Sequence, residues 1–201
     1  MFTNAINALP EWFPNTLLVK CEKKNLKKKE YLFQLDEKAT DIFFVERGEV
    51  QALKPLPNGA SAILQRSSGN EFFAEADMFF SHYTCDARVT RKAVIYCIPK
   101  QGLEEHLKRD NDFSMRFSGL LAANTRKLCS RMERLRINRA RDRVLHYLVC
   151  ESDADKVITL KSSLAYFAEE LGLEPETLYR TLSELQKENM INRRGETITL
   201  V

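Results

Sequence analysis

Short apolar runs separated by turn residues occupy the first half of the chain, between Lys20 and Pro99. Runs of this length and spacing predict the strands of a compact all-β unit. The Asn58-Gly59 dipeptide predicts a hairpin, because both central residues of the tightest hairpin turns take φ above zero. Gly48 lies between two β-rich runs. The basic run at residues 23–30 predicts a solvated edge strand, and a surface patch that binds nucleic acid is the alternative. The predicted strands lie in EYLFQL, DIFFVERGEVQALKPL, SAILQR, NEFFAEADMFF and CDARVTRKAVIYCIP.

A long helix is predicted next, because apolar residues recur at helical spacing without proline from Leu103 to about Ile137. The stripe suits a helix that pairs with a second copy of itself, and the alternative is that it only covers the β core of one chain. The arginine-rich end of the segment is predicted to hinge near Ile137 and Asn138, and its arginines either face DNA phosphates or pair with nearby acids. The predicted interface residues are Phe117, Leu121, Asn124, Leu128, Met132 and Leu135.

The last third of the chain has the spacing of a helix-turn-helix. Ser162 or Ser163 can cap a first helix, Gly172 permits the turn, and Pro175 suits the first turn of a second helix. The apolar residues expected on the inner faces are Leu164, Phe167, Ala168, Leu171, Leu178, Leu182 and Leu185.

The outer face of the second predicted helix begins with polar residues that suit a DNA major groove. There Arg can donate two hydrogen bonds to guanine, and Glu can accept a hydrogen bond from the N4 amine of cytosine. Behind it, MINRRGETITLV predicts a hairpin turning at Arg194-Gly195, with KVITL (residues 156–160) as its partner strand. Together these features predict a winged DNA-binding domain. The base-reading candidates are Glu176, Thr177, Tyr179 and Arg180, and the phosphate-contact candidates are Ser162, Ser163, Arg193 and Arg194.

The composition is that of a globular protein and does not indicate a particular chemical activity. The chain has 201 residues, 44% hydrophobic and 29% charged, with a net charge of +3 that is too small to argue for nucleic acid by itself. We find no membrane-length apolar run and no signal-peptide pattern, so a cytoplasmic protein that does not enter a membrane is expected. The five cysteines are widely spaced and the three histidines lie far apart, which predicts neither a metal site nor catalytic residues.

The order of β unit, long helix and winged helix-turn-helix resembles the Crp/Fnr family of bacterial transcription regulators. The most specific similarities are EPETLYRTLSELQKENMI, at the recognition helix, and GNEFFAEADMF, at the phosphate-binding region. The resemblance implies an α+β fold with a cyclic-nucleotide-binding-like β-roll (jelly roll) at 1–109, a dimerisation helix at 110–137 and a winged helix-turn-helix at 138–201. It also implies a homodimer that binds a pseudo-palindromic operator on double-stranded DNA and contacts RNA polymerase.

The same resemblance questions the family's best-known ligand. Glu75 matches the glutamate that holds the ribose, whereas the Arg-Ser pair that holds the cyclic phosphate aligns with Cys85 and Asp86. A phosphate would then meet a carboxylate, so binding of cAMP is disfavoured. On the long helix, the polar pair that contacts the base aligns with Leu128 and Cys129.

Other signals remain open at the level of sequence. His82 lies near the haem-ligating histidine of one family branch, although that branch's cysteine ligand aligns with Phe80. Cys85, three residues after His82, is a candidate redox thiol or a packed side chain. A cyclic-nucleotide- or haem-responsive regulatory module is the alternative function. The sequence does not identify the effector, the operator, the target genes or whether the protein activates or represses.

Overall fold

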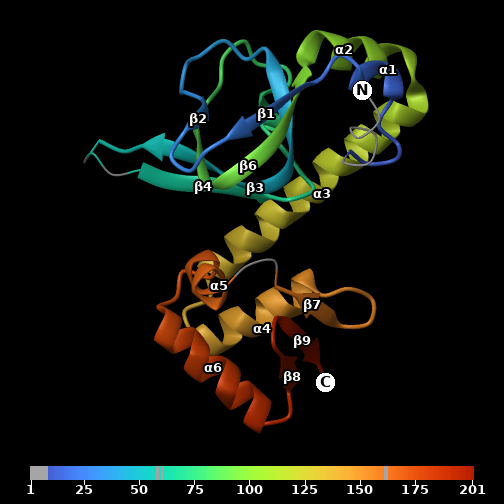
Figure 1. Ribbon diagram of the computed structural model, residues 1–201. Helices are drawn as coiled ribbons and strands as arrows, with labels where there is room; N and C mark the ends of the chain where they lie inside the picture. The colour runs from blue at the N-terminus through green and yellow to red at the C-terminus, as the bar shows by residue number, and fades with distance from the viewer. Residues whose placement is uncertain (1–8, 58, 60, 161–162) are drawn as a thin grey trace. The chain divides into compact units, whose positions relative to one another are not determined.

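The computed structural model describes residues 9–57, 59, 61–160 and 163–201. Its contacts divide the chain into two units, Met1–Leu121 and Ala122–Val201. The first unit is the β-roll with its covering helices, and the second contains the end of the long helix (residues 122–135), three further helices and a small sheet (Figure 1).

The β-roll of the first unit is an antiparallel sheet. Its main path runs β1, β6, β3, β4, with β2 added to β6 and β5 added to β3. The strands are β1 (Glu22–Leu26), β2 (Tyr31–Phe33), β3 (Asp41–Pro55), β4 (Ser61–Ser68), β5 (Glu71–Phe73) and β6 (Asp86–Pro99).

Strand β3 is buried on both faces, which explains why its apolar residues run together instead of alternating with polar ones. Phe43 and Val45 point into the core of the roll, while Ile42 and Phe44 point to the other face, where helices pack. Successive side chains on a strand point to opposite faces, so two cores need apolar residues at every position. The second core contains residues of α1 (Asn15–Leu18), α2 (Lys100–Arg109) and the start of α3 (Asn111–Leu135).

Gly48 bends β3 within one continuous strand. The sequence places Gly48 between two β-rich runs, and the pairing of β3 with β6 shifts register on both sides of it. Its φ is +91°, and a Cβ there would lie 2.3 Å from the carbonyl oxygen of Lys92. A glycine is therefore required at this bend for its backbone angle and for the close approach of the neighbouring strand.

The predicted hairpin joins β3 to β4, whose last pair is Pro55 with Ser61. Gly59 takes φ +81° and donates its N–H to the carbonyl oxygen of Leu56 at 2.9 Å. Asn58, the other half of the predicted turn, lies outside the described residues.

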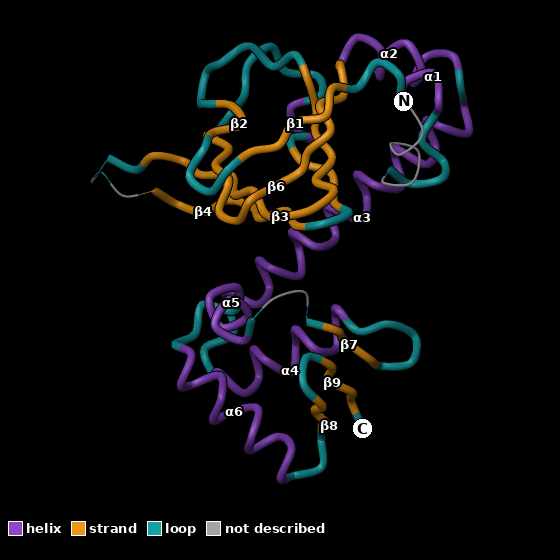
Figure 2. The backbone as a smooth tube through the Cα atoms, viewed as in Figure 1, coloured by secondary structure: helices purple, strands orange, loops and turns teal. Residues whose placement is uncertain are grey.

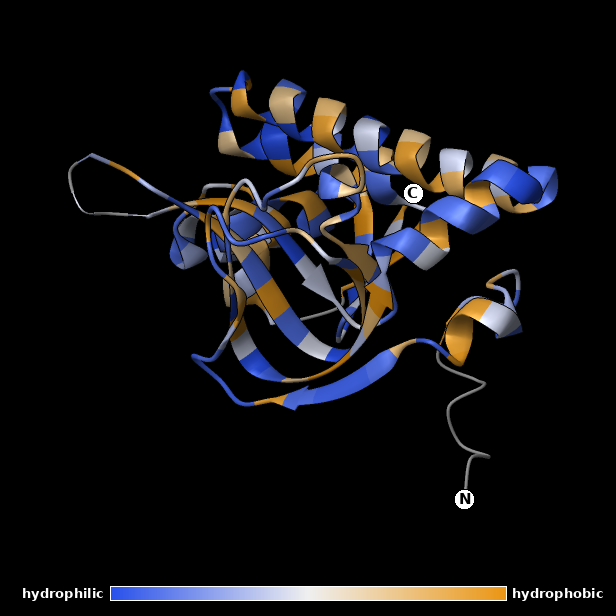
Figure 3. Ribbon diagram, turned by 90° about the horizontal axis from the view of Figure 1, so that it is seen from above, coloured by the Kyte–Doolittle hydropathy of each residue, from blue (hydrophilic) through white to orange (hydrophobic). Residues whose placement is uncertain are grey.

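The basic run forms the edge strand β1, which Figure 3 shows as a mostly hydrophilic strand. Its four leading residues are exposed, as expected for a solvated edge. Lys23 pairs with Glu46 at 2.6 Å and Lys24 with Glu22 at 3.6 Å.

The long helical segment is two helices, which corrects the prediction of unbroken periodicity from Leu103. Helix α2 ends at Arg109, and Asp110 takes an extended conformation with φ −119° and ψ 103°. Its Oδ1 accepts a hydrogen bond from the N–H of Phe113 at 3.0 Å, so the carboxylate caps α3. The apolar pattern hides this break because both helices cover the same core.

The second unit has the elements predicted for a winged helix. Helices α4 (Ala140–Glu151), α5 (Leu164–Glu170) and α6 (Pro175–Lys187) accompany strands β7 (Val157–Thr159), β8 (Ile191–Arg194) and β9 (Thr197–Leu200), as Figure 2 shows. The three strands pair antiparallel in the order β7, β9, β8, and Gly195 in the β8–β9 turn takes φ +61°. The predicted wing and its partner strand are thus present. One apolar core of twelve buried residues, which includes Leu148, Phe167 and Leu182, joins the helices to the wing.

Candidate nucleic-acid interface and sensor pocket

The turn between α5 and α6 has the local geometry of a helix-turn-helix. The Oγ of Ser163 caps α5 by accepting from the N–H of Tyr166 at 3.4 Å. Gly172 takes φ +63°, and Pro175 occupies the first turn of α6, where its missing N–H costs nothing. The chain therefore leaves α5, turns within a few residues and starts α6 against the same core.

Helix α6 separates an apolar inner face from a polar outer face. Leu178, Leu182 and Leu185 are buried, whereas the candidate base-reading residues Glu176 and Arg180 are exposed. Tyr179 is 43% exposed and Thr177 is half-buried, with its carbonyl accepting the Thr181 hydroxyl at 2.8 Å. Exposed polar side chains at the N-terminal end of such a helix are the ones that reach base edges in a major groove.

Two residues of the same outer face were missed by the sequence analysis. Ser183 and Lys187 are exposed and follow Glu176 and Arg180 at helical spacing. The Ser183 hydroxyl donates to the carbonyl of Tyr179 at 2.9 Å, and Arg180 lies 4.0 Å from Glu184. The helical period would have identified both residues, had it been continued past the first turn of α6.

The candidate phosphate contacts lie on two different elements of this unit. Ser163 is at the N-terminus of α5, and Ser162 lies outside the described residues. Arg193 and Arg194 are on β8 in the wing, where Arg194 is exposed and the Arg193 Nε donates to the carbonyl of Gly195 at 3.2 Å. The geometry leaves Arg194 as the more accessible of the two.

Turning to the first unit, the segment after β5 forms a short 3₁₀ turn, η1 (Glu75–Asp77). Ala74 enters it with φ +62°, a left-handed angle that favours glycine. Glu75 is only 6% exposed, so the residue predicted to hold a ribose is buried.

A buried lysine holds the segment that follows η1. The ammonium of Lys100, at the start of α2, donates to the carbonyl oxygens of Asp77, at 2.9 Å, and Phe80. The Thr84 hydroxyl donates to the carboxylate of Asp77 at 3.0 Å, and burial raises the pKa of that carboxyl. These bonds connect residues 77–84 to the first turn of α2.

Cys85 and Asp86 are both used inside the β-roll. The Cys85 thiol is buried, and burial, together with the charges of Asp77 and Asp86, raises its pKa to about 11. Of the two roles expected for Cys85, these surroundings favour the packed side chain. Asp86 Oδ1 accepts a hydrogen bond from the N–H of Leu35 at 2.8 Å, so its carboxylate holds the end of β2 in place. Neither residue offers a phosphate a positive charge.

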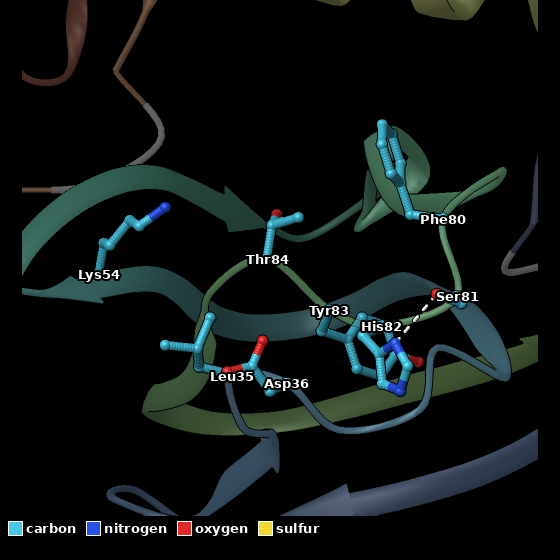
Figure 4. Close-up of a pocket in the computed structure, with 8 residues that line it drawn as sticks. All are labelled: Leu35, Asp36, Lys54, Phe80, Ser81, His82, Tyr83 and Thr84. Carbon is cyan, nitrogen blue, oxygen red and sulfur yellow. Dashed lines mark hydrogen bonds between the residues drawn. The ribbon is translucent and has the colours of Figure 1, made fainter.

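An open pocket of about 320 Å³ lies beside this segment. Of the predicted effector residues, His82 lines it, with its Nδ1 3.0 Å from the hydroxyl of Ser81; Glu75, Cys85 and Asp86 do not. Figure 4 shows Lys54 at one end of the pocket and Phe80 at the other. The volume is at the lower end of the range for small-molecule sites. The lining residues are Leu35, Asp36, Lys54, Phe80, Ser81, His82, Tyr83 and Thr84.

The predicted interface residues of α3 differ in how much of their surface is free. Phe117 is buried in the helix-covered core of the first unit, so its ring packs within its own chain. Leu121 and Asn124 are half-buried. Farther along α3 the side chains are open, and Leu128, Met132 and Leu135 are 52%, 61% and 70% exposed. Cys129 is also exposed and, like Leu128, belongs to the second unit.

In the described ranges, no helix combines the length and the apolar character needed to cross a membrane. Among those same residues, the His, Cys, Asp and Glu side chains form no cluster of three suited to a metal ion.

Two family models match the chain. Residues 23–110 match the cyclic nucleotide-binding domain, and residues 142–201 match the Crp-like helix-turn-helix domain. The first match covers the β-roll and α2, and the second covers nearly all of α4 and the elements after it.

Individual proteins agree with these assignments. The chain is 23% identical to the cAMP-activated global transcriptional regulator CRP of Pasteurella multocida, over 98% of this chain and 97% of the relative. The solved structure of FixK2 from Bradyrhizobium japonicum superposes with a TM-score of 0.66 at 21% identity, covering 90% of this chain and 92% of FixK2. The structure of a CooA mutant from Carboxydothermus hydrogenoformans superposes with a TM-score of 0.69 at 17% identity, covering 100% of this chain and 92% of the CooA chain. At such identities the structural neighbours show the fold. With a cyclic nucleotide-binding domain followed by a Crp-like helix-turn-helix, the chain belongs to the Crp/Fnr-type transcription regulators.

Proposed function

We propose that this regulator is a cytoplasmic homodimer that reads a pseudo-palindromic operator with α6, works with RNA polymerase and does not respond to cAMP. Its parts are a sensor domain at 1–109, a dimerisation helix at 110–137 and a DNA-binding domain at 138–201. The break at Asp110 and the end of α3 at Leu135 support these boundaries.

The observation that carries DNA reading is the outer face of α6. Glu176, Tyr179 and Arg180 are exposed at the start of a helix whose other face is anchored by buried leucines. A fixed backbone with free polar side chains is what sequence-specific contacts in the major groove require. By the resemblance, the residues at positions 175 and 179 differ from those at the matching positions of the family's cyclic-AMP receptor. We therefore expect this protein to read a different half-site sequence.

Dimerisation is supported by the exposed apolar residues on the C-terminal half of α3. Leu128, Met132 and Leu135 follow one another by four and three residues, so they share one face of the helix. Each is more than half exposed in the single chain. A second α3 packed along this face would bury all three, and each fully buried side chain contributes about 1.5–3 kcal/mol.

The absence of a cAMP response is supported by the chemistry of the sensor segment. At the position matched to the phosphate-binding pair, Cys85 is buried with a raised pKa and Asp86 is held by the N–H of Leu35. A cyclic phosphate would be placed against a carboxylate in partly buried surroundings, where like charges repel more strongly than in water. Titration calorimetry with cAMP should give no binding heat, and a response at micromolar cAMP would contradict this part of the proposal.

The test of DNA reading starts from duplexes selected by the full-length protein from a randomised library. Arg180→Ala should weaken binding to the selected sequence by about 1–3 kcal/mol, because a bidentate contact to guanine is lost. Binding to a scrambled duplex at the same salt concentration should change little. Gln186→Ala, an exposed position on the last turns of the same helix, serves as the control. Equal affinities of R180A and wild type for the selected duplex would overturn the role of Arg180.

A further inference from the structure

The arginines at the end of α3 and the start of α4 were expected to face DNA phosphates or to pair with nearby acids, and two of them make contacts inside the second unit. Arg134 lies in the last turn of α3, and its side chain is 6% exposed. Its Nη1 lies 3.3 Å from the Glu151 Oε1 at the end of α4, and its guanidinium carbon lies 4.9 Å from the centre of the Tyr147 ring. Arg134 therefore joins the end of α3 to the C-terminal half of α4.

Tyr147 extends this contact to the helix-turn-helix. Its ring packs against that of Phe167 on α5, with centroids 4.8 Å apart, and its hydroxyl donates to the Glu170 Oε2 at 3.5 Å. Burial raises the pKa of the Glu170 carboxyl, and the positive charge of Arg134 acts in the opposite direction. The end of α3, α4 and α5 thus share one set of polar contacts.

Arg143, on α4, makes a second bridge through backbone oxygens. Its Nε and Nη2 donate to the carbonyl of Ile137, at 2.9 and 2.6 Å, in the connection between α3 and α4. Its Nη1 donates to the carbonyls of Leu171 and Gly172, at 3.1 and 3.2 Å, in the turn of the helix-turn-helix. One guanidinium therefore holds the predicted hinge and the turn that precedes α6.

Burying the Arg134 side chain is not by itself an efficient way to gain stability. Removing a guanidinium from water is costly, and apolar residues of similar volume often stabilise a buried site as well or better. What a planar guanidinium adds is a fixed direction for each N–H. Contacts of this kind suit a site where the angle between helices matters more than the stability of their packing.

We propose that Arg134 and Arg143 are positioning residues, which fix the recognition helix α6 relative to the C-terminal half of α3 and thereby set the operator spacing that the dimer accepts. The inference rests on the proposed function, in which two α3 helices pair. If each α6 is held rigidly to its α3, the two reading helices have one separation and one relative rotation. Each base pair inserted between half-sites rotates one of them by about 34°, so a rigid dimer rejects altered spacing.

The experiment compares full-length variants on duplexes that carry the selected half-sites with spacers changed by one or two base pairs, and on a duplex with one half-site. We expect wild type to prefer one spacing by about tenfold or more, and Arg134→Met and Arg143→Lys to reduce that preference to about threefold or less. In R143K, one ammonium cannot bond both the hinge carbonyl and the turn carbonyls. Affinity for the single half-site should stay within about twofold, because the α6 side chains are unchanged.

Arg141→Met is the matched control. Arg141 lies on the same helix as Arg143, and its guanidinium binds both carboxylate oxygens of Glu188, at 2.8 and 2.5 Å, and the sulfur of Met190, at 3.0 Å. R141M should keep the wild-type spacing preference. The inference is overturned if R134M and R143K both keep that preference, or if half-site affinity falls in parallel with operator affinity. If wild type binds no two-half-site duplex more tightly than a single half-site, the proposed dimeric reading itself fails.

Discussion

The recognition helix α6 and the sensor segment at residues 74–86 use their polar residues in opposite ways. On α6, Glu176 and Arg180 are exposed and available to a partner. In the sensor segment, Asp77 and Asp86 accept hydrogen bonds from within the β-roll, and Glu75 is buried. Both segments were identified by family-like motifs, yet the three acidic side chains of the sensor segment lie within the fold, whereas Glu176 and Arg180 of α6 lie on its surface.

The difference shows how a site's architecture limits what a motif can reveal. A reading face lies on one helix, so the helical period alone separates its free side chains from the buried ones. A ligand pocket in a β-roll is made by several strands and a loop, and each polar side chain can bond either a ligand or the fold. The pocket at His82 illustrates this, since it combines Lys54 from β3 with residues 80–84 and with Leu35 and Asp36.

The largest expected effect is the loss of stability when a glycine of the first unit is replaced, compared with a glycine of the second. Gly48→Ala should destabilise the β-roll by roughly 4 kcal/mol, because it combines a left-handed φ with a Cβ 2.3 Å from the Lys92 carbonyl oxygen. Gly172→Ala, with φ +63° and its nearest contact at 3.5 Å from Arg143, should cost only about 1 kcal/mol. Urea unfolding of both variants tests this, and equal losses would show that backbone angle alone decides.

Thiol reactivity gives the next largest difference. With its pKa raised to about 11 from an ordinary value of 9.0, Cys85 has about 100-fold less thiolate near pH 7.5 than an unshifted thiol. Cys129 and Cys150, which are exposed, should therefore react first with a maleimide or with peroxide. Mass spectrometry of timed samples measures the order of modification. Early labelling of Cys85 in the folded protein would restore it as a redox candidate.

Removing the buried lysine tests whether the sensor segment depends on α2. Lys100→Met leaves the carbonyls of Asp77 and Phe80 without their donor, which should cost about 2 kcal/mol. Amide hydrogen exchange should become faster at residues 77–84. Lys108→Met, which removes an exposed pair with Glu104 at 4.0 Å, should change stability by less than about 0.5 kcal/mol. Matching losses in the two variants would contradict the assigned role of Lys100.

The smallest effect concerns pH. Burial raises the pKa of Asp77, so the folded state binds the proton more tightly than the unfolded chain does. As pH rises from the pKa of Asp77 in the unfolded chain to its pKa in the folded protein, the wild type loses stability. At pH values below both pKa values, Asp77 is protonated in both states and this loss is absent. Asp77→Asn keeps an acceptor for Thr84 and removes this loss, so its stability relative to wild type should rise from pH 3 to pH 7. If the difference in unfolding free energy between Asp77→Asn and wild type stays constant from pH 3 to pH 7, the buried Asp77 carboxyl does not contribute to the pH dependence of stability.

Much of the fold could be predicted because strong local signals agree with it. The helix-turn-helix, the wing and the edge strand β1 follow from period, turn residues and charge, since each is a short element with one exposed face. The break at Asp110 was missed because both helices bury apolar residues in one core, so the pattern runs on across a capping aspartate. The run that contains β3 was predicted in one piece, although Gly48 within it lies between two β-rich stretches and bends the strand.

The candidate site was less predictable, and the arginines show why. From sequence, Arg134, Arg141 and Arg143 are alike: basic residues on helices beside acidic ones. The structure gives them different partners. Arg134 contacts a half-buried glutamate and an aromatic ring, Arg141 contacts an exposed glutamate at the end of α6, and Arg143 donates to backbone carbonyls. Carbonyl oxygens carry no sequence signal, because every residue has one.

By itself, the sequence determined the order of the parts and the motif of the DNA-binding domain. These features depend on residues that are neighbours along the chain. Only the tertiary structure decided that Cys85 is a buried thiol of raised pKa, that Lys100 holds the sensor segment and that two arginines tie the hinge to the helix-turn-helix. Burial and hydrogen bonding between distant segments set those properties, and both arise only when the chain folds.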